Sequence, residues 1–443
     1  MDIFSIASNK PEGKKEEEVN ILVMCRIRPL LEEELETQEQ LRCIEMNSKE
    51  MITINAKNKA HTFHFDYIFD EEATQATIYN VAAEKIIKQT FQGYDGTIIA
   101  YGQSLSGKTF TIQGDIDIDY YSGIASRMVD TLLEVMNEAE ETMEFIVGGS
   151  VMGIKGNKIF DLLDPENKQI TIEYDEQHGV YIEGLKDIPI ESGYDMYNFL
   201  NDVNKNKREK NVHVVYRLTI TANNTETFMC KIGHLNLVDL SLEGDENEEL
   251  KEQRNEEVKD QEIKDEANEI IEDIRKKLAI INSKGIKSTD KRTKADIKDH
   301  VLVKGIDKLL DKIELIESLN TKEKSSDIKV LRNVVEALID NKVNSACYKD
   351  SVLTQILQES IGGHARTCVI LTLSPLLEDA EKTLETCKFG QLVKNIKNTP
   401  RVNTRNNLKE LEAAILRLEN QLDVKERRIE QLEGFLITHN DNN

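Results

Sequence analysis

Apolar and polar positions along this chain follow both strand-like and helix-like periods, which predicts a mixture of strands and helices. The apolar, β-branched run "VNILVMCRIRPL" at 19–30 is stopped by Pro29 and predicts a buried strand. The segment "HTFHFDYIF" at 61–69 alternates and predicts a second strand. Residues 76–91, "ATIYNVAAEKIIKQTF", carry apolar side chains at helical spacing and predict a helix.

Two further runs, "GTIIAYG" at 96–102 and "HLNLVDL" at 234–240, predict buried strands. The first leads directly into a glycine-rich loop, and the second ends at Asp239. Strands that alternate with helices in this way predict an α/β fold, with a central β-sheet flanked by helices on both faces.

The pattern changes after Asp239 and again near the C-terminus. Residues 243–272 are strongly acidic, residues 284–304 are basic, and a globular pattern resumes near Val330. Residues 408–436 predict a C-terminal coiled coil, because apolar residues recur at alternating spacings of three and four, interrupted only by Lys425. An amphipathic helix packed on its own domain is the alternative. The apolar positions are Leu408, Leu411, Ile415, Leu418, Leu422, Ile429, Leu432 and Leu436.

The net charge of −24 argues against a nucleic-acid partner, because phosphate neutralisation needs basic surface. The six cysteines form no C-x-x-C pair, which is typical of reduced thiols in the cytosol. Residues 1–18 predict a flexible leader without the apolar segment of a secretory signal. No apolar run approaches the length of a membrane span, so we expect an intracellular protein without one.

Residues 100–114, "AYGQSLSGKTFTIQG", contain G-x-x-x-x-G-K-T between a predicted strand and a predicted helix. In such a loop Gly102 and Gly107 let backbone N–H groups turn toward phosphate oxygens. Lys108 would reach the β- and γ-phosphates, and the Thr109 hydroxyl would bind Mg²⁺. The alternative is a loop that keeps this shape for packing only.

Asp239, at the end of an apolar strand, is the candidate carboxylate for the Mg²⁺ site. A strand-end aspartate also serves as a helix cap or begins a turn, and this alternative stays open. Lys108 and Asp239 are therefore the candidate catalytic residues, and Thr109 and Asp239 the candidate metal ligands.

Taken together, several stretches in this order resemble the motor domain of a kinesin. They cover most of 19–400 and are "CRIRPL" (25–30), "FDEEATQATIYN" (69–80), "GTIIAYGQSLSGKTFTIQG" (96–114), "LVDL" (237–240), "YKDSVLTQILQESIGGHARTCVILTLSP" (348–375) and "TLETCKFGQLVKNIKN" (383–398). The resemblance implies a P-loop NTPase fold with a mixed central sheet over 19–398, a neck linker at 399–407 and a motor that resembles plus-end-directed members.

The resemblance also implies site residues and partners. Arg26, Arg28 and Pro29 match the family's adenine-contacting R-x-R-P, and Tyr79 would lie near the base. The implied ligands are ATP or ADP with Mg²⁺, and the partners are microtubules and a second chain bound through 408–436. The implied location is the microtubule cytoskeleton of the cytoplasm. The phosphate loop would comprise Gly102, Gln103, Ser104, Leu105, Ser106, Gly107, Lys108, Thr109 and Phe110.

Three departures from the family's pattern change this expectation. The first switch, normally N-x-x-S-S-R-S-H, is replaced by "KREKNVHVVYRLTI" at 207–220, which has no serine. The second, normally D-L-A-G-S-E, reads "DLSLEGDE" at 239–246 with Leu242 at the glycine position; Gly244 and Glu246 take the family's places only if two residues are inserted. An insertion at about 243–330 would lie at the filament-binding face.

The basic residues of this insertion, Lys284, Lys287, Lys291, Arg292, Lys294, Lys298 and Lys304, form either a replacement contact for acidic microtubules or a solvated segment. Phosphoryl transfer depends on positioning groups that the altered switches lack, whereas binding rests on the loop and Lys108. We therefore expect nucleotide binding with slow or absent hydrolysis. The functions that remain are a divergent motor and a non-motile tether or heterodimer partner of an active motor; a P-loop NTPase unrelated to microtubules is disfavoured by the match at 348–375.

Overall fold

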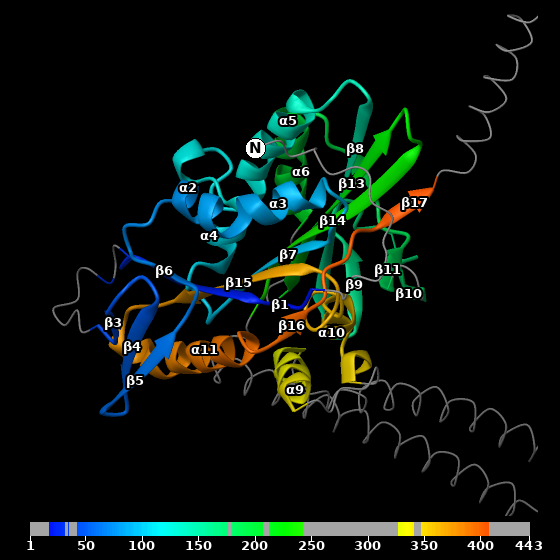
Figure 1. Ribbon diagram of the computed structural model, residues 1–443. Helices are drawn as coiled ribbons and strands as arrows, with labels where there is room; N and C mark the ends of the chain where they lie inside the picture. Colours follow the sequence, from blue (N-terminus) through cyan, green and yellow to red (C-terminus); the bar gives the residue numbers. More distant parts are fainter. Residues whose placement is uncertain are drawn as a thin grey trace, which may run out of the picture. The chain divides into compact units, whose positions relative to one another are not determined.

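The computed structural model describes residues 17–31, 34, 42–167, 169–175, 179–206, 212–241, 327–340 and 347–406. The chain divides into two compact units, one made of Met1–Leu242 with Val330–Asn443 and the other of Glu243–Lys329. The predicted insertion at 243–330 and coiled coil at 408–436 lie almost wholly or wholly outside the described residues. Apart from residues 327–329 at the start of one helix, all the described residues belong to the first unit (Figure 1).

A mixed central sheet is the frame of this unit, as the sequence predicts. Its strand order is β12-β8-β13-β14-β7-β15-β2-β6, with β9 paired to β8 and β17 paired to β14. The strands β14, β7, β15, β2 and β6 are mutually parallel, whereas β12, β8, β13 and β14 pair antiparallel. The bounds are β2 Leu22–Ile27, β6 Tyr67–Phe69, β7 Gly96–Tyr101, β8 Met143–Lys155, β9 Lys158–Asp161, β12 Ile188–Pro189, β13 His213–Asn224, β14 Met229–Asp239, β15 Arg366–Leu373 and β17 Thr404–Asn406.

Helices cover both faces of the sheet. On one face lie α2 Gln75–Ile78, a π-helical turn Tyr79–Ala83, α3 Glu84–Thr90, α4 Lys108–Ile112, α5 Ile124–Glu138 and α6 Gly193–Asn206. On the other lie α9 Asp327–Ile339, α10 Val352–Ile356 and α11 Ala380–Val393 (Figure 1). Short 3₁₀ turns occupy Asp119–Tyr121, Cys347–Asp350 and Leu377–Asp379. All six residues of β7 are buried between these layers, which fits a sequence of apolar and small residues without a charge.

The helix predicted at 76–91 and the strands predicted at 96–102 and 234–240 are confirmed in type. The single strand predicted at 61–69 is wrong, because two strands of different sheets share this segment. Residues Lys59–His64 form β5 of a separate three-stranded sheet with β3 Ile44–Met46 and β4 Met51–Ala56. The chain then crosses to the central sheet at Asp66, whose carboxylate Oδ2 accepts the Val23 N–H at 2.7 Å before β6 begins.

The segment before the predicted coiled coil forms two strand pairs, of which only the one made by β17 belongs to the central sheet. Lys397–Asn398 (β16) pairs with β1, Val19–Asn20, and β17 pairs with the start of β14. Between these pairings the Asn403 N–H donates to the Gly93 carbonyl at 2.8 Å. A separate hairpin consists of β10 Thr171–Asp175 and β11 Gly179–Glu183. Among the helices that the structure describes, none is long and apolar enough to cross a membrane.

Candidate nucleotide site

The loop between β7 and α4 has the backbone geometry that the G-x-x-x-x-G-K-T motif predicts. Gly102 comes directly after the buried strand, and a Cβ there would lie 2.2 Å from the Thr372 carbonyl oxygen of β15. Gly107 has φ +99° in the left-handed region, and nothing lies within 4 Å of a Cβ added to it. The first glycine is therefore required by close packing, and the second by the turn that leads into α4.

Side-chain hydrogen bonds within the loop stabilise its turn conformation. The Ser106 hydroxyl donates to the Gln103 carbonyl at 2.7 Å and contacts Thr372 Oγ1 at 2.6 Å. Lys108 Nζ also donates to the Gln103 carbonyl, at 2.7 Å, so the ammonium lies inside the loop. Ser104 and Leu105 are exposed at the tip, with Leu105 at φ +60°. The structure thus brings Lys108 and the loop residues together as the motif predicts.

Thr109 and Asp239 meet at the N-terminal end of α4. The Thr109 hydroxyl donates to Asp239 Oδ2 at 2.6 Å, although the two residues are 130 positions apart. Parallel pairing of β14 with β7 sets Asp239 beside Ala100, at the strand end from which the loop departs. A hydroxyl and a carboxylate oxygen are ligands that suit Mg²⁺, so this pair fits the implied metal. In the described part of the chain, no cluster of three or more His, Cys, Asp or Glu offers a rival metal site.

Arg26 joins β2 to α4. Its Nη1 donates to Gln75 Oε1 at 2.9 Å and to Thr111 Oγ1 at 2.8 Å, and its guanidinium lies 5.0 Å from the Phe110 ring centroid. Burial lowers the pKa of Arg26 to about 10, which still leaves it a cation at neutral pH. Arg26 therefore supports the half-exposed Phe110 ring, beside which a cleft of ≈ 530 Å³ opens.

Gln75 is a site residue that the sequence analysis did not single out. Besides accepting from Arg26, its Nε2 donates to the Phe110 carbonyl at 2.6 Å and to the Tyr121 carbonyl at 3.0 Å. These bonds connect α2 to α4 and to the chain after it. Gln75 lies within the quoted match at 69–80, but spacing alone does not distinguish it from its neighbours.

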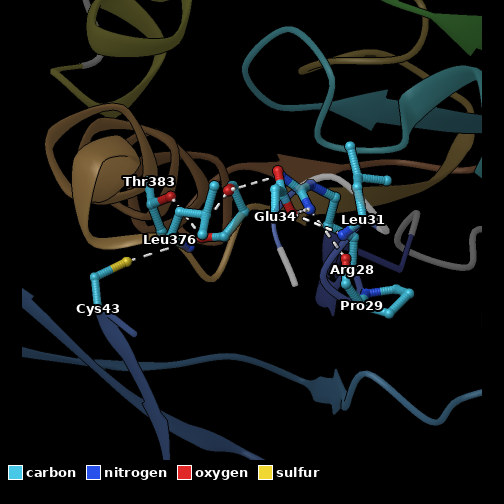
Figure 2. A network of polar contacts seen from close by, with 8 residues as sticks. Arg28, Pro29, Leu31, Glu34, Cys43, Leu376 and Thr383 are labelled. Atoms are coloured by element: carbon cyan, nitrogen blue, oxygen red, sulfur yellow. Dashed lines mark hydrogen bonds and ion pairs between the residues drawn. The ribbon is translucent and has the colours of Figure 1, made fainter. Parts of the chain in front are cut away.

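Arg28 forms an ion pair with the carboxylate of Glu34, within the polar network that Figure 2 shows. Its two terminal nitrogens donate to the two Glu34 oxygens at 2.7 and 2.6 Å, and Nη1 also donates to the Pro29 carbonyl. Nη2 reaches Ser374 Oγ at the end of β15 at 3.2 Å. Arg28 therefore holds the turn around Pro29 against the sheet. Its contact with adenine, and that of Pro29, remain predictions.

Tyr79 lies in the core of the unit. The residue is 6% exposed, and its hydroxyl donates to Thr131 Oγ1 of α5 at 2.6 Å. The π-helical turn that contains it packs against α3 and α5, so the ring faces other helices. The structure gives this tyrosine a packing role, and its predicted position near the base stays a prediction.

The Arg28–Glu34 pair predicts a pH dependence of stability. Hydrogen bonding to Arg28 lowers the pKa of Glu34, so the carboxylate contributes stability above the ordinary glutamate pKa, which is lost as pH falls through the lowered value. We expect Glu34→Gln to reduce the free energy of unfolding at neutral pH. The difference from the unsubstituted protein should shrink below about pH 4.5. Urea unfolding over a pH series measures it.

The control for this prediction is Glu381→Gln, which removes a carboxylate from an exposed pair with Lys57. An exposed pair contributes little, so this variant should follow the unsubstituted protein at every pH. A Glu34→Gln difference that is unchanged across the whole pH series would contradict the assigned ion pair.

The comparisons with known proteins agree with this geometry. The family model described as "Kinesin motor domain" matches residues 26–279 and 313–396. This chain belongs to the kinesin motor domain family. The unmatched residues 280–312 between the two parts fall inside the insertion predicted at about 243–330.

Named relatives are also kinesins. Kinesin-related protein 3 of Dictyostelium discoideum is 29% identical over 94% of this chain, and the kinesin heavy chain of Botryotinia fuckeliana is 27% identical over 94%. This chain spans 30% of the first relative and 41% of the second. A solved structure described as a fast kinesin matches with a TM-score of 0.66 and 27% identity, over 88% of this chain and 95% of that one.

The altered kinesin switches are described in part: residues 212–220 of the first segment and 239–241 of the second are described, whereas 207–211 and 242–246 are not. The described ends of the two segments meet: the Ser241 N–H donates to His213 Nδ1 at 3.0 Å. His213 lies within the first segment and begins β13, and Ser241 lies within the second segment, after the end of β14. This kinesin therefore keeps a direct contact between the two segments despite the altered motifs.

Proposed function

We propose that this kinesin motor domain binds Mg-ATP at Gly102–Thr109 and couples slow hydrolysis of ATP to movement along microtubules. The observation that carries the proposal is the contact of Thr109 with Asp239 at 2.6 Å beside the loop that holds Lys108. A loop kept only for packing has no need for a buried lysine, a hydroxyl and a carboxylate at one strand end.

The residues of the site divide the work of binding. Backbone N–H groups of the loop and the Lys108 ammonium would hold the phosphates, and Phe110, supported by Arg26, offers an aromatic face for the base. Thr109 and Asp239 would hold Mg²⁺, which supplies positive charge to neutralise the phosphate oxygens. The chain's own contribution is thus orientation and charge complementarity rather than covalent chemistry.

Slow turnover follows from the residues that the switches lack. The segment 207–220 has no serine to complete the metal shell or to place water, and Leu242 stands where a glycine N–H would contact the γ-phosphate. Loss of one such electrostatic group costs about 10²–10³-fold in rate in other enzymes. Binding does not depend on these groups, so we expect this protein to keep its affinity for nucleotide while its rate of hydrolysis is low.

The same losses support a second candidate function, a tether that binds nucleotide without moving. Such a protein would dimerise through 408–436, with a second copy or with an active motor, and would reside on microtubules in the cytoplasm. The pairing of β17 with β14 of the central sheet supports the motor instead, because it holds residues 404–406, part of the expected neck linker, against the core.

Steady-state ATP hydrolysis with and without microtubules tests the proposal. Filament pelleting in ADP and in a non-hydrolysable ATP analogue runs beside it. We expect measurable but slow turnover that microtubules increase. Nucleotide binding without turnover, together with pelleting, would favour the tether. Failure to bind nucleotide would rule out both the motor and the nucleotide-binding tether.

A further inference from the structure

Gln113 connects the end of the phosphate-loop helix to two other elements. It follows α4 directly, and its backbone N–H donates to the Thr109 carbonyl at 2.8 Å. Its side-chain Nε2 donates to Asn204 Oδ1 of α6 at 2.7 Å, while its Oε1 accepts from the Tyr216 hydroxyl of β13 at 3.2 Å. One buried amide therefore uses both its donor and its acceptor between separate parts of the fold.

In the hydrogen bond between Tyr216 and Gln113, the tyrosine hydroxyl is the donor. Tyr216 is 3% exposed and packs beside Phe199 of α6, with ring centroids 6.4 Å apart. Burial, with a smaller effect from the negative charge of Asp239, raises the pKa of Tyr216, so its hydroxyl stays protonated and donates to Gln113. The amide oxygen of Gln113 is the matching acceptor, and its NH₂ group is left to donate to Asn204.

The strand that carries Tyr216 is also tied to Asp239. β13 pairs with β14 along its length, with Tyr216 opposite Leu237 and Val214 opposite Asp239. Gln113 thus fixes the C-terminal end of α4 to the strand pair that holds Asp239. At its N-terminal end, α4 meets that carboxylate through Thr109. A helix of five residues held at both ends has little freedom to rotate.

We propose that Gln113 is a positioning residue of the nucleotide site: by holding α4 on β13 and α6, it keeps Thr109 and Asp239 together as one Mg²⁺ site. This inference rests on the proposed function, because it assumes that Mg-nucleotide binds there. It predicts that Gln113 affects the part of nucleotide affinity that depends on Mg²⁺ and leaves the metal-independent part unchanged.

The test compares affinities for a fluorescent ATP analogue in Mg²⁺ and in EDTA. Gln113→Met keeps a long side chain in the core without the two hydrogen bonds. We expect it to reduce the Mg²⁺-dependent gain in affinity by about tenfold, since each lost bond is a modest net effect. The affinity in EDTA should stay unchanged. Tyr216→Phe, which removes one of the two bonds, should reduce the gain by a smaller factor.

Tyr197→Phe is the matched control, because the Tyr197 hydroxyl of α6 bonds only to the surface carboxylate of Asp117 among the contacts described, at 2.9 Å. Tyr197→Phe should show the same Mg²⁺-dependent gain in affinity as the unsubstituted protein. The double variant Gln113→Met/Tyr216→Phe should lose no more than Gln113→Met alone, because both changes remove the same contact.

The outcomes separate the two proposals. If the unsubstituted protein shows no Mg²⁺-dependent binding, the proposed function fails. If it does, but Gln113→Met keeps the full gain, the positioning role is overturned. An equal loss of affinity in Mg²⁺ and in EDTA, with a lower melting temperature, would also overturn it, because that result describes general destabilisation.

Discussion

Lys108→Ala should lose nucleotide binding almost completely. The ammonium is the only cationic side chain inside the described loop, where it donates to the Gln103 carbonyl at 2.7 Å, and phosphate is its expected partner in the complex. A hydrogen bond to a charged group contributes up to about 3 kcal/mol, which corresponds to roughly 150-fold in affinity. Titration with a fluorescent ATP analogue measures the loss.

The fold itself should survive this substitution. The Gln103 carbonyl still accepts a hydrogen bond from the Ser106 hydroxyl at 2.7 Å, so the loop retains its turn conformation. The matched control is Lys88→Ala on α3, where the half-exposed lysine pairs with Glu84 and Glu134 away from the loop. It should bind nucleotide as the unsubstituted protein does. Unchanged affinity for the ATP analogue in Lys108→Ala would contradict the proposal that this loop binds phosphate.

Gly102→Ala should destabilise the whole unit. The added Cβ would lie 2.2 Å from the Thr372 carbonyl oxygen and 2.4 Å from its hydroxyl, both on the neighbouring strand β15. Neither β7 nor β15 can move away without breaking sheet pairing, because both are central strands. We expect a loss of about 3 kcal/mol or more in the free energy of unfolding, at the upper end of overpacking effects.

Urea unfolding measures this loss, with Gly193→Ala as the control. Gly193 begins α6, and nothing lies within 4 Å of a Cβ added to it. The control should therefore change stability by less than about 1 kcal/mol in either direction. Equal midpoints for the two variants would show that the loop does not pack against Thr372 as described.

Much of the candidate site was predictable because its signals are local. Six consecutive apolar or small residues in β7 indicate a strand buried on both faces, and the glycine-rich loop with Lys108 follows without a gap. Asp239 was predictable because it ends an apolar strand downstream of the phosphate loop, where a carboxylate for Mg²⁺ is expected. Its contact with Thr109 depends on the parallel pairing of β14 with β7, which the structure shows.

Other parts depend on partners far away in the chain. Alternation at 61–69 indicates strand, but only the pairing of β5 with β4 and of β6 with β2 shows where one sheet ends and another begins. The R-x-R-P match assigns Arg28 to the base, whereas the folded chain places Glu34 against it. Periodicity describes which residues are buried and leaves open which polar groups meet.

The sequence by itself determined the family, the strand–loop–helix context of the phosphate loop and the choice of Lys108, Thr109 and Asp239 as candidate site residues. These features rest on apolar periodicity and on residue types at fixed short spacings. Only the tertiary structure decided that Gln113 bonds to Tyr216, 103 positions away, and that Tyr79 faces the core. The physical reason is that a side-chain hydrogen bond is selected by packing of whole elements, and no local pattern records that packing.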